Sequence, residues 1–211
     1  MGDFMDFFDL HCDTLTECMD DGDSLLKNER DIDFERGSIF GRWNQVFAVF
    51  VPDSMDDSLV EGYFDSACDF YFDELKKKGD VFPILSSEDV RGHSRGVMLA
   101  MESSRGVGSL ERLEKLYERG LRLITLTWNH KNRAAGGCDE GGGLTDWGRE
   151  LVSKMEKLGI VTDVSHLSDR SFYDLCEFSD APFIASHSDA RAVHNEVRSL
   201  TDDQIKIIIE R

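Results

Sequence analysis

The chain has 211 residues, with 42 acidic and 24 basic side chains and a formal net charge of −18 at pH 7. This charge argues against nucleic acids and anionic membrane surfaces as partners, because both are negatively charged. The length and the 40% hydrophobic content suit a single domain with a buried core, which we assign to residues 1–211.

The cysteines and the N-terminal segment bear on the compartment. Five cysteines, an odd number without CxxC spacing, do not fit a disulfide framework and predict a reducing environment. The opening segment MGDFMDFFDL contains acids and no basic region, unlike a secretory signal. No apolar run approaches the roughly 18 residues of a membrane span. We therefore predict a cytoplasmic protein with no membrane partner.

Short apolar runs alternate with helical patterns along the chain. Runs typical of buried parallel strands lie at residues 7–10, 46–51, 96–101, 121–127, 159–164 and 182–185. A further run at 81–85 is expected to be a strand associated with a loop. Repeated strand–helix units imply a parallel α/β sheet. The count is six barrel-type strands, whereas a closed (β/α)8 barrel needs eight.

Helices are predicted between these runs. Residues 60–78 have the length and the amphipathic pattern of one helix. Ser109 and Thr145 are expected to cap the next two helices. Thr201 and Gln204 form a capping-box pattern ahead of an Ile-rich helix.

Four of the predicted strands end in a His or an acidic residue. In chain order these residues are His11 with Asp13, then Glu102, His166 and His187. Because parallel sheets and barrels carry their sites at the carboxyl ends of the strands, we expect the five side chains to converge. A single His at the end of a strand is more often a residue that simply hydrogen-bonds within the protein than a metal ligand. Glu102 alone could cap a helix. The five together favour a metal site.

The chemistry of these side chains suits zinc. In an extended strand His11 and Asp13 point to the same side, with Cys12 turned away. The two oxygens of Glu102 could bridge two ions about 3.5–4 Å apart. Such a pair of ions holds a bridging hydroxide and polarises a carbonyl, which is hydrolytic chemistry at neutral pH.

The segment 129–143 is the most glycine-rich loop and contains GGCDEGGG. Such a loop is typical of a segment near a site, and equally of an ordinary flexible surface loop. His130, in TWNHKN, either contacts substrate or merely lines this loop. The sequence has no GxSxG motif, and GGG at 141–143 lacks the GK[ST] ending of a phosphate-binding loop.

The order of six segments resembles a known family. They are DLHCDT, AMES, LTLTWNHKN, GLTDWGRELVSKMEKLGIVTDVSHLS, IASHSDARAV and NEVRSLTDDQI. Over essentially the whole chain they resemble the renal (membrane) dipeptidase-type zinc metallopeptidases, particularly the bacterial members. The resemblance implies a (β/α)8 barrel, two zinc ions and the hydrolysis of dipeptides.

The resemblance also implies roles for single residues. His11 and Asp13 would bind one zinc ion, and His166 and His187 would bind the other. Glu102 would bridge the two ions and take part in catalysis.

Two further roles and one departure follow from the same resemblance. Arg198 would hold the substrate carboxylate, a task that suits a guanidinium fork. His130 would orient the substrate as a second catalytic residue. The usual Glu-Gly pair of the family is Glu102-Ser103 here.

The resemblance implies a longer chain than this one. The last two strands, and a Gly-Ser-Asp segment whose Asp passes a proton to the leaving amine, would follow Arg211. We therefore expect a C-terminally incomplete barrel domain with about six of the eight β/α units.

Three hypotheses about function stay open. The first is a metallodipeptidase in which a zinc-bridging hydroxide attacks the peptide bond of a small dipeptide. The second is another amidohydrolase-like hydrolase or deaminase, but that superfamily usually begins with His-x-His and uses a bridging Lys. The third is an inactive zinc-binding fragment or paralogue. The sequence also leaves a homo-oligomer open.

Overall fold

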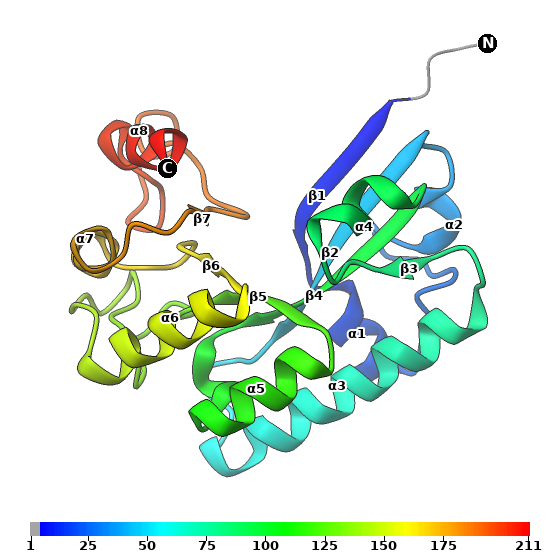
Figure 1. The fold of residues 1–211 in the computed structure, drawn as a ribbon, viewed down its shortest axis with the longest axis horizontal. Coiled ribbons are helices and arrows are strands. Elements are labelled where there is room, and N and C mark those ends of the chain that lie inside the picture. Colours follow the sequence, from blue (N-terminus) through cyan, green and yellow to red (C-terminus); the bar gives the residue numbers. More distant parts are fainter. Residues whose placement is uncertain (1–4) are drawn as a thin grey trace.

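The computed structural model describes residues 5–211, which form a parallel sheet with helices along it (Figure 1). The strands are β1 (Asp6–Cys12), β2 (Arg42–Phe50), β3 (Phe82–Pro83), β4 (Arg95–Glu102), β5 (Leu121–Thr125), β6 (Val161–Asp163) and β7 (Phe183–Ile184). Their order is β1-β2-β4-β5-β6-β7, with β3 paired to β4, and every pair is parallel. The predicted α/β fold class is confirmed as a partial barrel.

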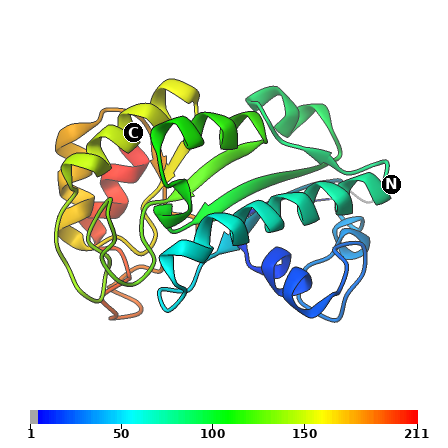
Figure 2. The same cartoon turned by 90° about the horizontal axis from the view of Figure 1, so that it is seen from below.

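The connections between the strands are mostly helical. The helices are α1 (Thr14–Asp21), α2 (Phe34–Gly37), α3 (Asp57–Lys77), α4 (Ser87–Gly92), the 3-10 helix η1 (Ser104–Val107), α5 (Leu110–Glu118), α6 (Asp146–Leu158), α7 (Asp169–Phe178) and α8 (Asp202–Glu210). Figures 1 and 2 show α3, α5 and α6 covering one face of the sheet, and α5 and α6 pack on β5 and β6. This alternation is what makes the sheet parallel, because each strand needs a crossover to the next.

The predicted helix starts are confirmed. Ser109 accepts a hydrogen bond from the N–H of Arg112 (3.1 Å), and Thr145 accepts one from the N–H of Gly148 (2.9 Å). Thr201 begins α8 with the reciprocal capping box that its spacing to a Gln predicts. These hydrogen bonds satisfy N–H groups that have no partner inside the helix.

The predicted strands are all present, but the last two are short. The runs at 159–164 and 182–185 form only three and two residues of strand, β6 and β7. The run at 81–85 forms β3, which lies off the main strand order as expected. β2 is buried over nearly its whole length, whereas β1 at the edge of the sheet is exposed in its first half.

Most of the apolar core lies between the sheet and its helices, around large buried side chains such as Trp43, Phe47 and Phe64. The opposite face of the sheet has a much smaller cluster, with Val46 and Leu123 among its buried members. All five cysteines are unpaired thiols. Within residues 5–211, no helix combines the length and the apolar character needed to cross a membrane.

Candidate metal centre

The five side chains that the sequence analysis singled out lie together at the carboxyl ends of the strands. His11 is in β1, Asp13 directly precedes α1, and Glu102 is the last residue of β4. His166 and His187 lie in the turns that follow β6 and β7. In a parallel sheet these ends share one edge, so residues far apart in sequence can face a single point.

Glu102 occupies the middle of the cluster. One of its oxygens, Oε2, lies 3.5 Å from Nε2 of His11. The other oxygen, Oε1, lies 3.2 Å from Nε2 of His166 and 3.3 Å from Nε2 of His187. The carboxylate therefore separates two groups of donor atoms, and each group contains one of its oxygens.

The first group is completed by Asp13, whose Oδ1 lies 3.4 Å from Nε2 of His11. Asp13 occupies the N-cap position of α1, yet its side chain makes no capping hydrogen bond. Its Oδ1 is shielded from solvent and has no hydrogen-bond partner among the described residues. Oδ1 therefore has no competing hydrogen bond and lies beside the ring nitrogen of His11, a position that fits the role of a metal ligand.

The second group consists of His166, His187 and Oε1 of Glu102. The two Nε2 atoms are 2.9 Å apart. Nδ1 of His166 lies 2.7 Å from Oδ1 of Asn129, which only accepts hydrogen bonds, so Nδ1 carries the proton. Nε2 of the neutral ring then presents its lone pair to Glu102 and His187. Two imidazole nitrogens and a carboxylate oxygen form a donor set that suits a divalent cation.

The protonation states of Glu102 and His166 agree with this role, whereas that of His11 opposes metal binding. Burial by itself raises the pKa of Glu102, but the surrounding imidazoles of His11, His166 and His187 outweigh burial and hold the pKa well below its usual range. Burial lowers the pKa of His166, so this ring is neutral at pH 7. Burial also lowers the pKa of His11, but the nearby carboxylates of Asp13 and Glu102 outweigh burial and raise the pKa to about 10. Metal binding to His11 therefore has to displace a proton.

Backbone strain accompanies two of these residues. Ser103, directly after Glu102, and His166 both have positive φ angles, 78° and 67°. Non-glycine residues rarely adopt such angles, and those that do are concentrated at functional sites.

Asp163, the last residue of β6, is a fully buried acid at the centre that the sequence analysis did not single out. Its carboxylate accepts hydrogen bonds from Oγ1 of Thr125 (2.8 Å) and the N–H of Ser165 (3.0 Å). It also accepts hydrogen bonds from the N–H (3.1 Å) and the hydroxyl (2.5 Å) of Ser186. Like Glu102 it is an acid that ends a strand, and that signal was available in the sequence.

Arg198 lies in the loop after His187 and is held against the centre. One guanidinium nitrogen donates a hydrogen bond to the carbonyl oxygen of His187 (2.7 Å). Within residues 5–211 the side chain forms no ion pair with an acid. Its remaining donors are therefore available to an anionic group beside the metal centre.

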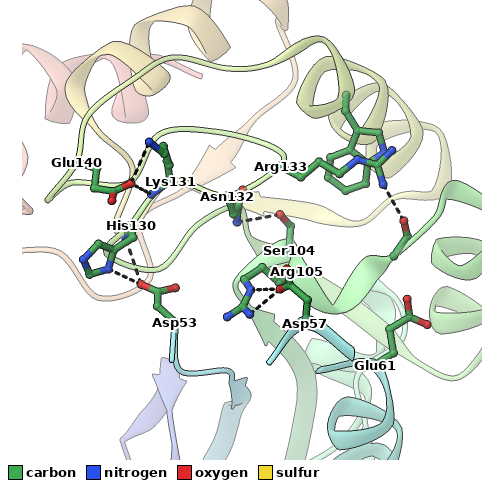
Figure 3. Close-up of a pocket in the computed structure, with 12 residues that line it drawn as sticks. Asp53, Asp57, Glu61, Ser104, Arg105, His130, Lys131, Asn132, Arg133 and Glu140 are labelled. Atoms are coloured by element: carbon green, nitrogen blue, oxygen red, sulfur yellow. Dashed lines mark hydrogen bonds and ion pairs between the residues drawn. The ribbon is translucent and has the colours of Figure 1, made fainter. Parts of the chain in front are cut away.

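His130 is placed apart from the five clustered side chains. Its ring is about half exposed and lies 2.7 Å from a carboxylate oxygen of Asp53. It lines a separate cavity of about 710 Å3, to which none of the five contributes (Figure 3). Trp128, two residues earlier, borders the five clustered side chains, with its ring centroid 6.3 Å from that of His166. The role of His130 in catalysis stays a prediction that this position does not favour.

The charged groups around this second cavity are largely satisfied by one another. Figure 3 shows Arg105 paired with Asp57 (2.6 Å) and Lys131 beside Glu140 (3.9 Å). Arg133 lies over the ring of Trp147, 4.4 Å from its centroid, and donates to a backbone carbonyl.

A family model described as membrane dipeptidase (peptidase family M19) matches residues 3–211. The chain belongs to the membrane dipeptidase family. The chain is 32% identical over 133 residues to an uncharacterised protein of the PQQ-III 3′ region of Acinetobacter calcoaceticus, a match that covers 58% of this chain and 42% of that protein. It is 32% identical over 137 residues to a pqqA 5′-region protein of Klebsiella pneumoniae, covering 59% and 51%. The match thus spans about half the length of these curated relatives.

Solved structures show the same fold for this membrane dipeptidase family member. A crystal structure of a metallopeptidase named dipeptidase AC superposes with a TM-score of 0.88 at 24% identity, covering 98% of this chain and 70% of that one. A Rhodobacter sphaeroides metallopeptidase, crystallised with a phosphinate mimic of the dipeptide L-Ala-D-Ala, gives 0.81 at 23% identity, covering 99% and 72%. At these identities the likeness establishes the fold.

Proposed function

We propose that this member of the membrane dipeptidase family binds two zinc ions and hydrolyses dipeptides. The observation that carries the proposal is the position of Glu102, whose two oxygens face two separate groups of donor atoms. A carboxylate that faces both groups, one with each oxygen, suits a site for two metal ions.

All of the proposed ligands come from this chain. His11 and Asp13 would hold one ion, and His166 and His187 would hold the other. When bound, two zinc ions supply a Lewis acid and the hydroxide that bridges them. The unpartnered oxygen of Asp13 and the close approach of the two Nε2 atoms support this assignment.

Arg198 is proposed to position the substrate. A dipeptide has a free carboxylate one residue beyond its scissile bond. The guanidinium of Arg198, fixed by its hydrogen bond to the backbone of His187, would bind this carboxylate and so direct the scissile carbonyl towards the metal centre.

The proposal is tested by metal content and by hydrolysis. Elemental analysis of the purified protein should give about two zinc ions per chain, and incubation with a dipeptide should release free amino acids. His187→Ala should lose metal from one position and lose hydrolysis, because it removes one of the nitrogens next to Oε1 of Glu102. His93→Ala is the matched control, since His93 stacks on Phe82 at the other end of the sheet.

Folded protein that binds no zinc and releases no amino acids would contradict the proposal. Hydrolysis of a dihydropyrimidine in place of dipeptides would instead identify a different hydrolase on the same scaffold.

A further inference from the structure

We infer that Asp163 and Ser186 form a relay that keeps the proton of His187 on Nδ1 and directs its Nε2 lone pair at the metal centre. Neither residue belongs to the proposed ligand set, and the inference rests on the proposed metal site. It makes both of them positioning residues, which act on the metal through His187.

The relay begins at Asp163, whose carboxylate is buried at the end of β6. Its oxygens accept hydrogen bonds from the hydroxyl groups of Thr125 and Ser186. They also accept hydrogen bonds from the backbone N–H groups of Ser165 and Ser186. An ionised carboxylate only accepts hydrogen bonds. The hydroxyl of Ser186, 2.5 Å from Oδ2, therefore has to donate its proton to Asp163.

The next step follows from the single proton of a hydroxyl group. Because Ser186 donates that proton to Asp163, its oxygen can only accept a hydrogen bond from His187. The oxygen lies 2.7 Å from Nδ1 of His187, so Nδ1 donates the hydrogen bond between them. A metal ion would then bind the lone pair of Nε2, the atom that lies 3.3 Å from Oε1 of Glu102.

In His166 the ring proton is also held on Nδ1, but by a different residue. There the amide oxygen of Asn129, in the loop after β5, accepts the Nδ1 proton directly. Two independent contacts thus present the Nε2 atoms of His166 and His187 to one point, 2.9 Å from each other. Hydrogen-bonded partners of metal-binding His residues fix the ring and its tautomer in this way.

Asp163 also stabilises the local backbone, because its carboxylate accepts a hydrogen bond from the N–H of Ser186 and its strand, β6, pairs with β7. The test must therefore separate positioning from stability. Ser186→Ala removes only the hydroxyl and leaves the backbone contacts in place. Ser186→Thr keeps a hydroxyl and should rescue the relay. Asp163→Asn reverses the polarity, because an amide can donate to Ser186 and release the serine proton towards His187.

Ser179→Ala is the matched control. Ser179 is a buried serine just before the amino end of β7, and its hydroxyl bonds to Glu156 and to the N–H of Ala181. Its removal perturbs the same strand at the end opposite to the metal centre.

Two readouts are compared for all variants. Zinc affinity is measured by competition with a chromophoric chelator, and the ring tautomer is measured from the imidazole 15N shifts of His187 in metal-free protein. Ser186→Ala and Asp163→Asn should weaken zinc binding about 10–100-fold, as other losses of such partners do. Ser186→Thr and Ser179→Ala should bind zinc as wild type does. The ring should be protonated on Nδ1 in wild type and in Ser186→Thr, and on Nε2 in Asp163→Asn.

The outcomes distinguish the relay from the metal site. Wild-type zinc affinity and an unchanged Nδ1 proton in folded Ser186→Ala would overturn the relay and leave the proposed function intact. Wild-type protein that binds no zinc would overturn the proposed function, and the ring shifts would still decide whether Ser186 sets the tautomer.

Discussion

Ser103 shows how the metal centre constrains the backbone at the scale of one residue. It follows Glu102, is completely buried, and has φ 78° and ψ 114°. Its hydroxyl makes only a long contact of 3.5 Å with Asn132. Glycine adopts positive φ angles without a steric penalty from Cβ, which gives a physical reason for the Glu-Gly pair usual in the family.

Replacing this residue by glycine should stabilise the protein. We expect Ser103→Gly to raise the free energy of unfolding by about 1 kcal/mol, because relief of the strained φ outweighs the added freedom of the unfolded chain. Urea denaturation measures the change. Ser104→Gly is the control and should lower stability, since the Ser104 hydroxyl donates a 2.7 Å hydrogen bond to the carbonyl of Leu126. Equal destabilisation by both variants would show that Ser103 is not strained.

At the scale of elements, local signals predicted four of the helices but missed others, among them the ten-residue α7 and the four-residue α2. Capping residues and amphipathic spacing predicted α3, α5, α6 and α8 because those signals lie within a few residues of one another. The four-residue α2 has too few positions to show a period. It is fixed by Asp33, whose nearly buried carboxylate accepts from the N–H (2.7 Å) and Nε (2.8 Å) of Arg36.

The contribution of Asp33 should depend on pH. Burial alone raises its pKa, but the N–H groups of Arg36 and Asn28 and then the guanidinium of Arg36 outweigh burial and hold the pKa below its usual value. The folded state therefore favours the ionised form. Its stabilising effect is present above about pH 4, the unfolded pKa, and is lost as pH falls through the folded pKa.

The variant Asp33→Asn tests whether the ionised carboxylate of Asp33 stabilises the protein through α2. Above pH 5 the variant should be less stable than wild type by about 1–2 kcal/mol, and the difference should shrink below pH 4. Denaturation curves collected across this range give the comparison. Asp31→Asn, an exposed acid two residues earlier, should show no such trend. A difference that stays constant down to pH 2 would refute the assignment.

The whole molecule is a curved sheet whose two edge strands, β1 and β7, are not paired with each other. Their carboxyl ends nevertheless converge, with the rings of His11 and His187 3.7 Å apart between centroids. The small inner cluster gives this side of the sheet little apolar packing of its own. Metal ions bound there would join β1, β4 and the turns after β6 and β7.

Zinc should therefore stabilise the folded chain as a whole. At a free zinc concentration 100 times the dissociation constant the gain is about 2.7 kcal/mol, which raises Tm by roughly 5–10 °C in a domain of this size. Thermal unfolding with zinc, and again after adding a chelator, measures the shift and its reversal. Glu102→Gln should abolish most of it, because that carboxylate serves both groups of ligands. An equal shift in the variant would place the zinc elsewhere.

The sequence by itself determined the order of the strands, the caps of α5, α6 and α8, and the five side chains that cluster at the strand ends. Those features depend on neighbours in the chain, such as a cap three residues before its donor or a His directly after an apolar run. Only the tertiary structure decided that Asp163 and Ser186 lie beside His187, that the ring of Trp128 lies 6.3 Å from that of His166, and that Ser103 has a positive φ. These depend on how separate strands end beside one another, and no local spacing in the sequence contains that information.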